Sequence, residues 1–159
     1  MMNAVYAGSF DCYTNGHHDI VKKAAVLFDR LYIVIAVNSE KRRRYPAELM
    51  QTAIAGTLEN DCLTNCTVCI HDGVVADFRI ENDIGYTIRG LRNRMDYDYE
   101  ENIAAVNKLI APNLETVYFR ADNNGISSSL IAELSKYRKD FSGLVPPAVN
   151  ELLLQCETE

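Results

Sequence analysis

Short apolar runs and amphipathic helical patterns alternate along the whole chain, and this alternation constrains its fold more than any other feature. The apolar runs lack the polar alternate positions of a strand with one solvated face, which is typical of strands buried on both sides. We expect five such strands, at residues 3–6, 31–37, 67–70, 86–88 and 116–119. Strands and helices in regular alternation predict a parallel sheet with right-handed crossovers.

Six stretches carry helical spacing. The first expected helix begins near Gly16 and has Ile20, Ala24, Leu27 and Phe28 on one face. The second follows Pro46 and repeats the pattern with Leu49, Ala53, Ile54 and Leu58. The third begins at residue 74 and has Val75 and Phe78 on one side. The other three span about 93–110, open at Ser127–Ser129 with Leu130, Ile131 and Leu134 inward, and open at Pro146 with Val149, Leu152 and Leu153 as the apolar stripe. Since no linker or repeat interrupts the 159 residues, we predict one α/β domain over 1–159. It is expected to be Rossmann-like and doubly wound, with a five-stranded parallel sheet and helices on both faces.

Net charge limits the classes of partner. The chain has 16 Lys and Arg against 22 Asp and Glu, which gives −6 and argues against coating nucleic acid or an anionic membrane surface. A local basic cluster that holds a small anion is still compatible with this balance. The apolar run at 31–37 is far shorter than the roughly 20 residues that span a bilayer, and the N-terminal residues lack the basic region of a secretory signal. We therefore expect a cytoplasmic protein.

The five cysteines are odd in number and are expected to be free thiols in a reducing compartment. Cys62, Cys66 and Cys69 have a spacing that zinc could use, but they supply only three ligands. We favour loop cysteines leading into a strand, and we assign no metal ligand among the side chains.

Ligands of open parallel sheets bind beyond the carboxyl ends of the strands. The loop after the first expected strand contains two glycines and leads into a helix, whose N-terminal amides favour phosphate. This loop contains Thr14-Asn15-Gly16-His17, and a distant segment, Ile126-Ser127-Ser128-Ser129, also opens a helix. Together they match the T/H-x-G-H and I-S-S-S signatures of the nucleotidyltransferase superfamily, in which the histidine binds a nucleoside triphosphate.

At closer range the chain resembles the bacterial phosphopantetheine adenylyltransferase family over essentially its whole length. The further matching segments are Gly8-Ser9-Phe10-Asp11, Asp72-Gly73, Ile88-Arg89-Gly90-Leu91-Arg92, 96–100, Ala111-Pro112, 114–117 and 142–146. That family transfers the adenylyl group of ATP to 4′-phosphopantetheine, giving dephospho-coenzyme A and pyrophosphate, the penultimate step of coenzyme A biosynthesis. The resemblance further implies Mg²⁺ as cofactor, a homohexamer, and coenzyme A as a possible feedback inhibitor.

The resemblance also implies roles for the matching residues. His17, Lys41, Arg92 and Ser129 are implied to be catalytic, with His17 stabilising the transition state. Ser9, Lys41 and Arg89 are implied to bind the phosphate of phosphopantetheine, and Val75 to line its pantetheine arm. The residues implied to bind ATP are Ser9, Phe10, His17, Gly90, Leu91, Arg92, Glu100, Ile126, Ser127, Ser128 and Ser129.

These residue types suit the reaction. The attacking group is the substrate's own phosphate, whose second pKa of about 6 leaves it largely ionised at neutral pH, so that no strong general base is needed. The site must align two polyanions and neutralise the charge that develops at the α-phosphate and on pyrophosphate.

Several of these residues also have simpler structural interpretations. Arg89 and Arg92 could form ion pairs with Asp96 or Glu100, and the three serines could simply cap a helix. We interpret His18 as a solvent-exposed helix start. Arg42, Arg43 and Arg44 are interpreted as mostly surface residues that could steer anions.

The chain departs from the family pattern at Ala7 and Cys12, where proline is usual, at Glu101, and across 120–125, a segment that helps to cover the adenine. Two other functions therefore stay open. One is a nucleotidyltransferase with another phosphate acceptor, such as nicotinamide mononucleotide or a glycerol phosphate, and the other is a non-catalytic nucleotide-binding paralogue. The presence of His17, Lys41 and Arg89 favours the adenylyltransferase.

Overall fold

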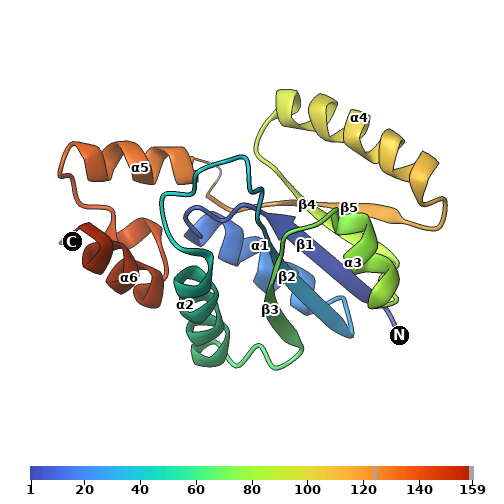
Figure 1. The fold of residues 1–159 in the computed structure, drawn as a ribbon, viewed down its shortest axis with the longest axis horizontal. Coiled ribbons are helices and arrows are strands. Elements are labelled where there is room, and N and C mark those ends of the chain that lie inside the picture. The colour runs from blue at the N-terminus through green and yellow to red at the C-terminus, as the bar shows by residue number, and fades with distance from the viewer. Residues whose placement is uncertain (124, 158–159) are drawn as a thin grey trace.

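Five parallel strands form a single sheet in the order β3-β2-β1-β4-β5 in the computed structural model, which describes residues 1–123 and 125–157 (Figure 1). The strands are β1 (Asn3–Gly8), β2 (Arg30–Ala36), β3 (Cys66–His71), β4 (Tyr86–Leu91) and β5 (Glu115–Arg120). The predicted α/β fold with a five-stranded parallel sheet is confirmed. Asn124, Thr158 and Glu159 lie outside the described residues.

Helices cover both faces of the sheet, as predicted (Figure 1). They are α1 (Asn15–Ala25), α2 (Ala47–Asn60), α3 (Val75–Glu81), α4 (Arg94–Ile110), α5 (Ser128–Lys136) and α6 (Pro147–Glu157), with a short 3-10 helix, η1 (Ser142–Leu144), before α6. Within the described residues, no helix is both long and apolar enough to cross a membrane.

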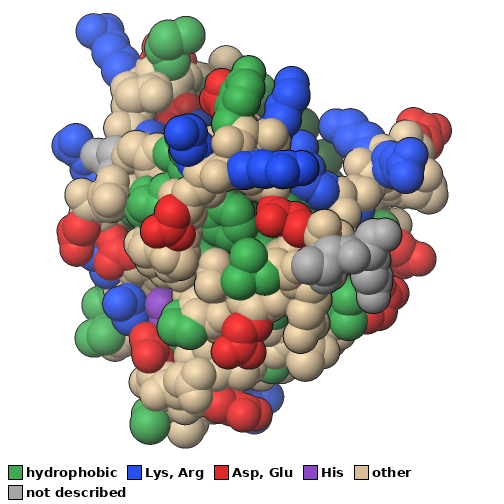
Figure 2. Space-filling view, turned by 90° about the vertical axis from the view of Figure 1, so that its left-hand side faces the viewer, with side chains coloured by type: hydrophobic (Ala, Val, Ile, Leu, Met, Phe, Trp, Pro, Cys, Tyr) green, Lys and Arg blue, Asp and Glu red, His purple; other side chains and the backbone are tan. Residues whose placement is uncertain are grey.

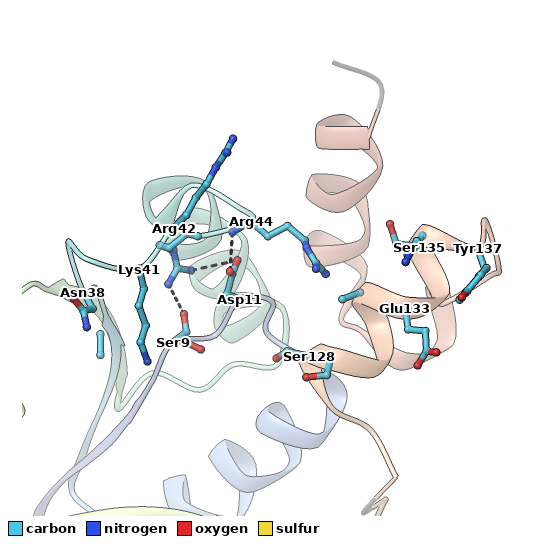
Figure 3. A pocket seen from close by; sticks show the side chains of 15 residues that line it. Ser9, Asp11, Asn38, Lys41, Arg42, Arg44, Ser128, Glu133, Ser135 and Tyr137 are labelled. Carbon is cyan, nitrogen blue, oxygen red and sulfur yellow. Dashed lines mark hydrogen bonds and ion pairs between the residues drawn. The ribbon is translucent and has the colours of Figure 1, made fainter.

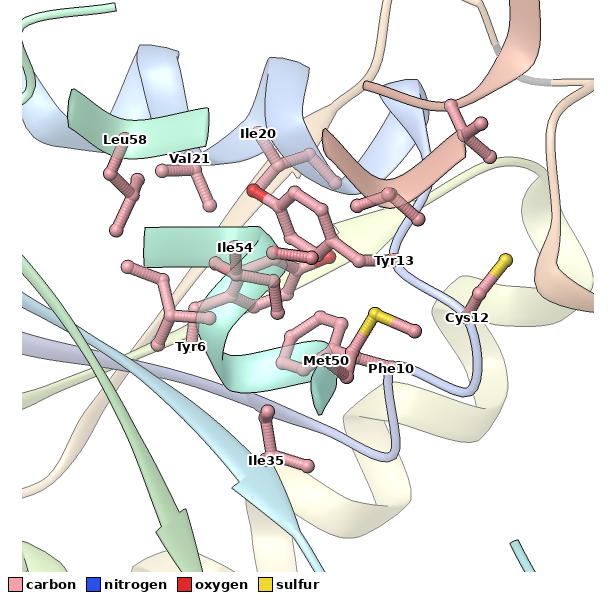
Figure 4. Close-up of a cluster of buried hydrophobic side chains, with 14 of the residues drawn as sticks. Tyr6, Phe10, Cys12, Tyr13, Ile20, Val21, Ile35, Met50, Ile54 and Leu58 are labelled. Atoms are coloured by element: carbon pink, nitrogen blue, oxygen red, sulfur yellow. The ribbon is translucent and has the colours of Figure 1, made fainter. Parts of the chain in front are cut away.

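The two faces of the sheet bury different amounts of apolar surface. Successive side chains of a strand point to opposite faces, so that Tyr6 and Ile33 join the large cluster under α1, α2 and α6, which Figure 4 shows in part. Val5 and Val34 point the other way into a smaller cluster, against which Phe78 of α3 packs. The larger cluster is therefore the main source of hydrophobic stabilisation.

Two residues expected on inner helix faces are exposed instead. Leu27 is 55% exposed because α1 ends at Ala25, before the stripe reaches it. Leu49 is 47% exposed because it lies between the first two buried positions of α2, Ala47 and Met50. The buried stripe, at helical spacing, consists of Ala47, Met50, Ala53, Ile54, Thr57 and Leu58.

Strand β4 is longer than the sequence predicted. Arg89, Gly90 and Leu91 were expected to follow the strand, but they lie within it and pair with β5. The Ile20 side chain of α1 packs closely over this end of β4: a Cβ added at Gly90 would lie 2.5 Å from the Cδ1 atom of Ile20. A larger residue at position 90 would therefore displace the end of the Ile20 side chain.

The cysteine cluster is only partly in a loop. Cys62 follows α2 and is exposed, whereas Cys66 and Cys69 lie inside β3 rather than before it. All five cysteines are free. Among the described residues, no group of three His, Cys, Asp or Glu side chains is arranged to hold a metal ion.

Candidate active site

Two adjoining clefts open where the strands end and α5 begins. The inner cleft, of about 350 Å³, lies between the end of β1, the end of β4 and the start of α5. The outer cleft, of about 1250 Å³, is lined by the segment after β2 and by α5 (Figure 3). The two clefts share Ser9, Ser128 and Ser129, so that a ligand in one can extend into the other.

The structure brings nearly all of the predicted site residues together. Those that line the inner cleft are Ser9, Phe10, His17, Arg89, Gly90, Leu91, Arg92, Glu100, Ile126, Ser127, Ser128 and Ser129. Lys41 lines the outer cleft, where its side chain points toward Ser9 (Figure 3). Val75 lines neither cleft, because it packs with Val5 on the face of the sheet that carries the smaller apolar cluster. The roles of all the predicted site residues in binding and catalysis stay predictions.

The first loop is held by aromatic packing. Phe10 has a φ of 42°, in the left-handed region, which costs a non-glycine residue roughly 1–2 kcal/mol. Its buried ring packs edge-on against Tyr6, Tyr13 and His17, at centroid distances of 5.3, 5.5 and 5.1 Å. This packing offsets the backbone strain and fixes the loop below the inner cleft.

His17 is oriented by the backbone of the residue that caps its helix. The Thr14 N–H donates to His17 Nδ1 at 3.1 Å, and the Thr14 hydroxyl accepts from the His17 N–H. Burial and the Arg92 charge lower the pKa of His17 to about 4, so the ring is neutral at pH 7. Because Nδ1 accepts a hydrogen bond, the single ring proton is on Nε2. His17 is therefore a neutral Nε2–H donor on the wall of the inner cleft.

His18 is not the solvent-exposed residue that we expected. It is 6% exposed and bonds to Tyr13 and Asp61. The helix turns this position inward, because residues 18 and 21 share the buried face of α1 with residue 24.

The two arginines of the inner cleft are held by carboxylates of α4. Arg89 donates from Nε and Nη2 to the two carboxylate oxygens of Glu100 at 2.6 and 2.7 Å, and Glu100 is buried. Arg92 pairs with Asp96 at 3.1 Å in a more exposed setting. Burial lowers the pKa of Arg89 and the Glu100 carboxylate raises it, with a net upward shift. The ion-pair interpretation of both arginines therefore describes this structure, and the anion-binding role remains available to their other N–H groups.

The serines both cap α5 and tie it to the first loop. The Ser127 hydroxyl accepts from the Leu130 N–H at 3.1 Å, which is the capping alternative. The Ser128 hydroxyl donates to the Cys12 carbonyl at 2.6 Å. Ser129 is exposed and lines both clefts.

Arg43 and Asp11 have structural roles that the sequence did not predict. Arg43 is not a surface residue, because its side chain is 15% exposed and donates to the Ser9 carbonyl at 2.6 Å. The Asp11 carboxylate accepts the N–H groups of Arg44 and Tyr45 at 2.8 and 2.9 Å, and its side chain lines the outer cleft (Figure 3). Asp11 lies in a matched segment and Arg43 in the basic run. The sequence pattern therefore marked both positions, but it did not indicate the hydrogen-bond partners of either residue.

Among the described residues, three carboxylates line the two clefts, and they do not form a metal cage. Asp11 accepts two backbone N–H groups, Glu100 is paired with Arg89, and Glu133 comes from α5. Mg²⁺ is usually bound through one or two carboxylates together with substrate phosphates and water. The residues present therefore fit an ion that is carried mainly by the phosphates of a nucleotide.

Comparison with known proteins agrees with this fold. Residues 5–134 match the family model described as cytidylyltransferase-like. A crystal structure from Vibrio parahaemolyticus, described as a candidate nicotinate-nucleotide adenylyltransferase, superposes with a TM-score of 0.74 over 100% of this chain and 97% of that one, at 15% identity. The second match shows a shared fold. The chain thus belongs to the cytidylyltransferase-like nucleotidyltransferases.

The sequence relatives are more specific. Phosphopantetheine adenylyltransferase of Shouchella clausii is 36% identical over 155 residues, which is 96% of each chain. The protein of the same name from Streptococcus pyogenes is 40% identical over 147 residues, covering 91% of this chain and 90% of its own. The chain belongs to the phosphopantetheine adenylyltransferase family.

Proposed function

We propose that this enzyme transfers the adenylyl group of ATP to 4′-phosphopantetheine, producing dephospho-coenzyme A and pyrophosphate. The observation that carries the proposal is the convergence of His17, Arg89, Arg92 and Ser129 on one inner cleft. A neutral donor, two guanidinium groups and a helix N-terminus there provide what two polyanions need. Membership of the phosphopantetheine adenylyltransferase family supports the choice of acceptor.

In the proposed reaction, a phosphate oxygen of phosphopantetheine attacks the α-phosphorus of ATP. A new P–O bond forms there while the bond from the α-phosphorus to the bridging oxygen breaks, and the electron pair leaves with pyrophosphate. His17 donates its Nε2–H to the phosphate oxygens on which negative charge increases. Its fixed neutral tautomer means that the donor is ready before the substrates arrive.

We assign the acceptor phosphate to Arg89 and Lys41. Glu100 occupies the Nε and Nη2 edge of Arg89, and Nη1 donates to the Ala7 carbonyl at 3.5 Å, which leaves one N–H on Nη1 and one on Nη2 for a phosphate. Lys41 is a flexible point charge that faces Ser9 from the outer cleft (Figure 3). The two residues thus approach the region of Ser9 from different sides. The role of Val75 along the pantetheine arm stays a prediction.

Mg²⁺ is part of the proposal as an ion that ATP brings with it. When bound, it would neutralise charge on the phosphate oxygens. Ser127, Ser128 and Ser129 at the start of α5 all line the inner cleft. We propose that their hydroxyl groups are the side-chain oxygens that would lie closest to the ion and the phosphates.

Coenzyme A carries the adenosine and pantetheine groups of both substrates, so we propose that it competes with them for the connected clefts. We place the reaction in the cytoplasm, where the five free thiols would stay reduced.

We further propose a homohexamer, assembled through α4. Five large hydrophobic residues of this helix are each more than half exposed, namely Met95, Tyr99, Val106, Leu109 and Ile110. A second copy of the chain is the partner that we assign to this surface. Sedimentation is expected to give six chains of 17.9 kDa, and Leu109→Glu is expected to dissociate them. A wild-type protein that sediments as a monomer would contradict this assembly.

Release of pyrophosphate tests the reaction. The wild-type protein is assayed with ATP or CTP, and with phosphopantetheine, nicotinamide mononucleotide or glycerol 3-phosphate as acceptor. We expect pyrophosphate only from ATP with phosphopantetheine. His17→Ala is expected to lower kcat by roughly 10²–10³-fold, as for loss of one oxyanion donor.

His71→Ala is the matched control, because His71 lies on β3 and its ring bonds to the Val74 carbonyl instead of lining either cleft. Its kcat is expected to equal that of the wild type. The proposal fails if another acceptor is the better substrate, if no acceptor yields pyrophosphate, or if His17→Ala keeps full activity.

A further inference from the structure

Three side chains outside the two clefts form a continuous hydrogen-bonded chain behind His17. The Tyr13 hydroxyl lies 3.0 Å from His18 Nδ1, and His18 Nε2 lies 2.9 Å from a carboxylate oxygen of Asp61. Tyr13 is fully buried in the large apolar cluster (Figure 4), and His18 is buried at its edge. The Asp61 side chain is 44% exposed at the end of α2. The chain therefore runs from the interior to the surface.

The hydrogen atoms of this chain have one consistent arrangement for a neutral His18. The Asp61 carboxylate only accepts, so His18 Nε2 donates to it and His18 Nδ1 keeps a lone pair. The Tyr13 hydroxyl then donates to Nδ1, and burial raises the pKa of Tyr13 well above its usual value, which keeps that proton in place. Each of the three groups is satisfied, and the orientation of the Tyr13 ring is fixed at its hydroxyl end.

Tyr13 is linked to His17 by its aromatic ring and through the neighbouring backbone. The Tyr13 and His17 rings stack at a centroid distance of 5.7 Å and an interplanar angle of 27°. The residue that follows Tyr13 in the sequence is Thr14, whose backbone N–H donates to His17 Nδ1. Tyr13 therefore contacts His17 through its ring and immediately precedes the backbone group that sets the His17 tautomer.

We propose that the Tyr13–His18–Asp61 chain is a positioning device for His17, which holds the His17 ring and its Nε2–H donor in the orientation required for adenylyl transfer. The inference rests on the proposed function of His17. None of Tyr13, His18 and Asp61 is among the lining residues of the inner or outer cleft, so each acts through His17 and not on the substrate. His18 and Asp61 instead border a separate hollow of about 500 Å³.

A double-mutant cycle separates positioning from simple structural support. His18→Leu removes the link, and we expect kcat to fall by about five- to tenfold, with the KM for ATP within about twofold of wild type. His18→Gln retains an acceptor for Tyr13 and a donor for Asp61, and is expected to recover most of kcat. In the His17→Ala background, His18→Leu is expected to leave the residual kcat unchanged, because the group being positioned is gone.

Thr57→Val is the matched control. Thr57 is also buried beside this hollow, and its hydroxyl donates to the Ala53 carbonyl at 2.8 Å, within α2. The substitution removes a buried hydrogen bond with no contact to His17, so we expect a lower Tm and an unchanged kcat. Tyr13→Phe provides a second test of the chain that keeps the stacked ring, and its kcat is expected to fall as in His18→Leu.

Nitrogen NMR of the His17 ring reads the positioning without any enzymatic activity. The wild-type ring is expected to show a lone pair on Nδ1 and a proton on Nε2, whereas His18→Leu and Tyr13→Phe should show values averaged between the two tautomers. Unchanged ring signals in both variants, or an equal fall in kcat in the wild-type and His17→Ala backgrounds, would overturn the inference. If the wild type lacks adenylyltransferase activity but its ring signals respond as expected, the proposed function fails and the positioning of His17 stands.

Discussion

His17 and Arg89 both line the inner cleft, and they are held there in different ways. His17 is fixed by a hydrogen bond from the Thr14 backbone N–H and by packing against aromatic rings. Arg89 is fixed by the carboxylate of Glu100, a side chain eleven residues further along on α4. The wall of the cleft that contains His17 thus depends on the local conformation of a loop. The wall that contains Arg89 depends on a charge pair between a strand and a helix. The difference predicts which perturbations each wall tolerates.

At neutral pH, the largest effect is expected when the charge pair is broken. Glu100→Ala leaves the guanidinium of Arg89 without its partner in a setting where the Arg89 side chain is 30% exposed. Loss of one partner of a fully buried pair costs roughly 3–5 kcal/mol, and with this exposure we expect the free energy of unfolding to fall by about 2 kcal/mol. We also expect the KM for phosphopantetheine to rise by about tenfold, because Arg89 is no longer held in one orientation.

Asp96→Ala is the control for this prediction, measured by chemical unfolding and initial rates in parallel. Arg92 and Asp96 form an i, i+4 pair on α4 and its preceding loop, in which the Arg92 side chain is half exposed. Such pairs contribute about 0.5 kcal/mol or less. The comparison of the two walls is wrong if Asp96→Ala costs as much as Glu100→Ala. It is also wrong if Glu100→Ala raises the KM for ATP and leaves that for phosphopantetheine unchanged.

The fold was largely predictable because it depends on the period of the apolar residues. Buried strands and amphipathic helices leave patterns that can be read within a few residues, as for the stripe of Val149, Leu152 and Leu153 on α6. The predictions were wrong near the ends of elements, where the residue pattern does not show the residue at which a helix or strand stops. Leu27 lies beyond the end of α1, and Arg89 was placed after a strand that in fact contains it.

The site was predictable as a set of residues and not as a set of contacts. Twelve predicted residues line the inner cleft, since each belongs to a matched segment near a strand end or a helix start. The partners of these residues could not be predicted, because a hydrogen bond such as that from Arg43 to Ser9 joins positions 34 residues apart. His18 was misread for the same reason, since Asp61 is 43 residues away and leaves no local signal.

Acid is expected to act on the His17 wall, and only within a limited pH range. Burial and the Arg92 charge lower the pKa of His17 from 6.5 to about 4 in the folded chain. Between these two values the unfolded chain binds the proton more readily than the folded one, so the free energy of unfolding falls as the pH decreases. The loss begins below about pH 6.5 and is complete only below about pH 4, and we expect it to be roughly 3 kcal/mol.

The measurement is the difference in the free energy of unfolding between the wild type and His17→Gln, followed by denaturant titration from pH 7 to pH 4. Glutamine does not titrate, so carboxylates elsewhere cancel in the difference, and the wild type should lose stability relative to the variant only within this window. Parallel curves across the whole range would mean that His17 is as free to protonate in the folded chain as in the unfolded one. The arginines keep their charge at every pH in the series. An acid response that disappears with His17→Gln therefore assigns the titrating group to the wall held by the loop, and it shows that this wall keeps its neutral donor at the pH where the enzyme is proposed to act.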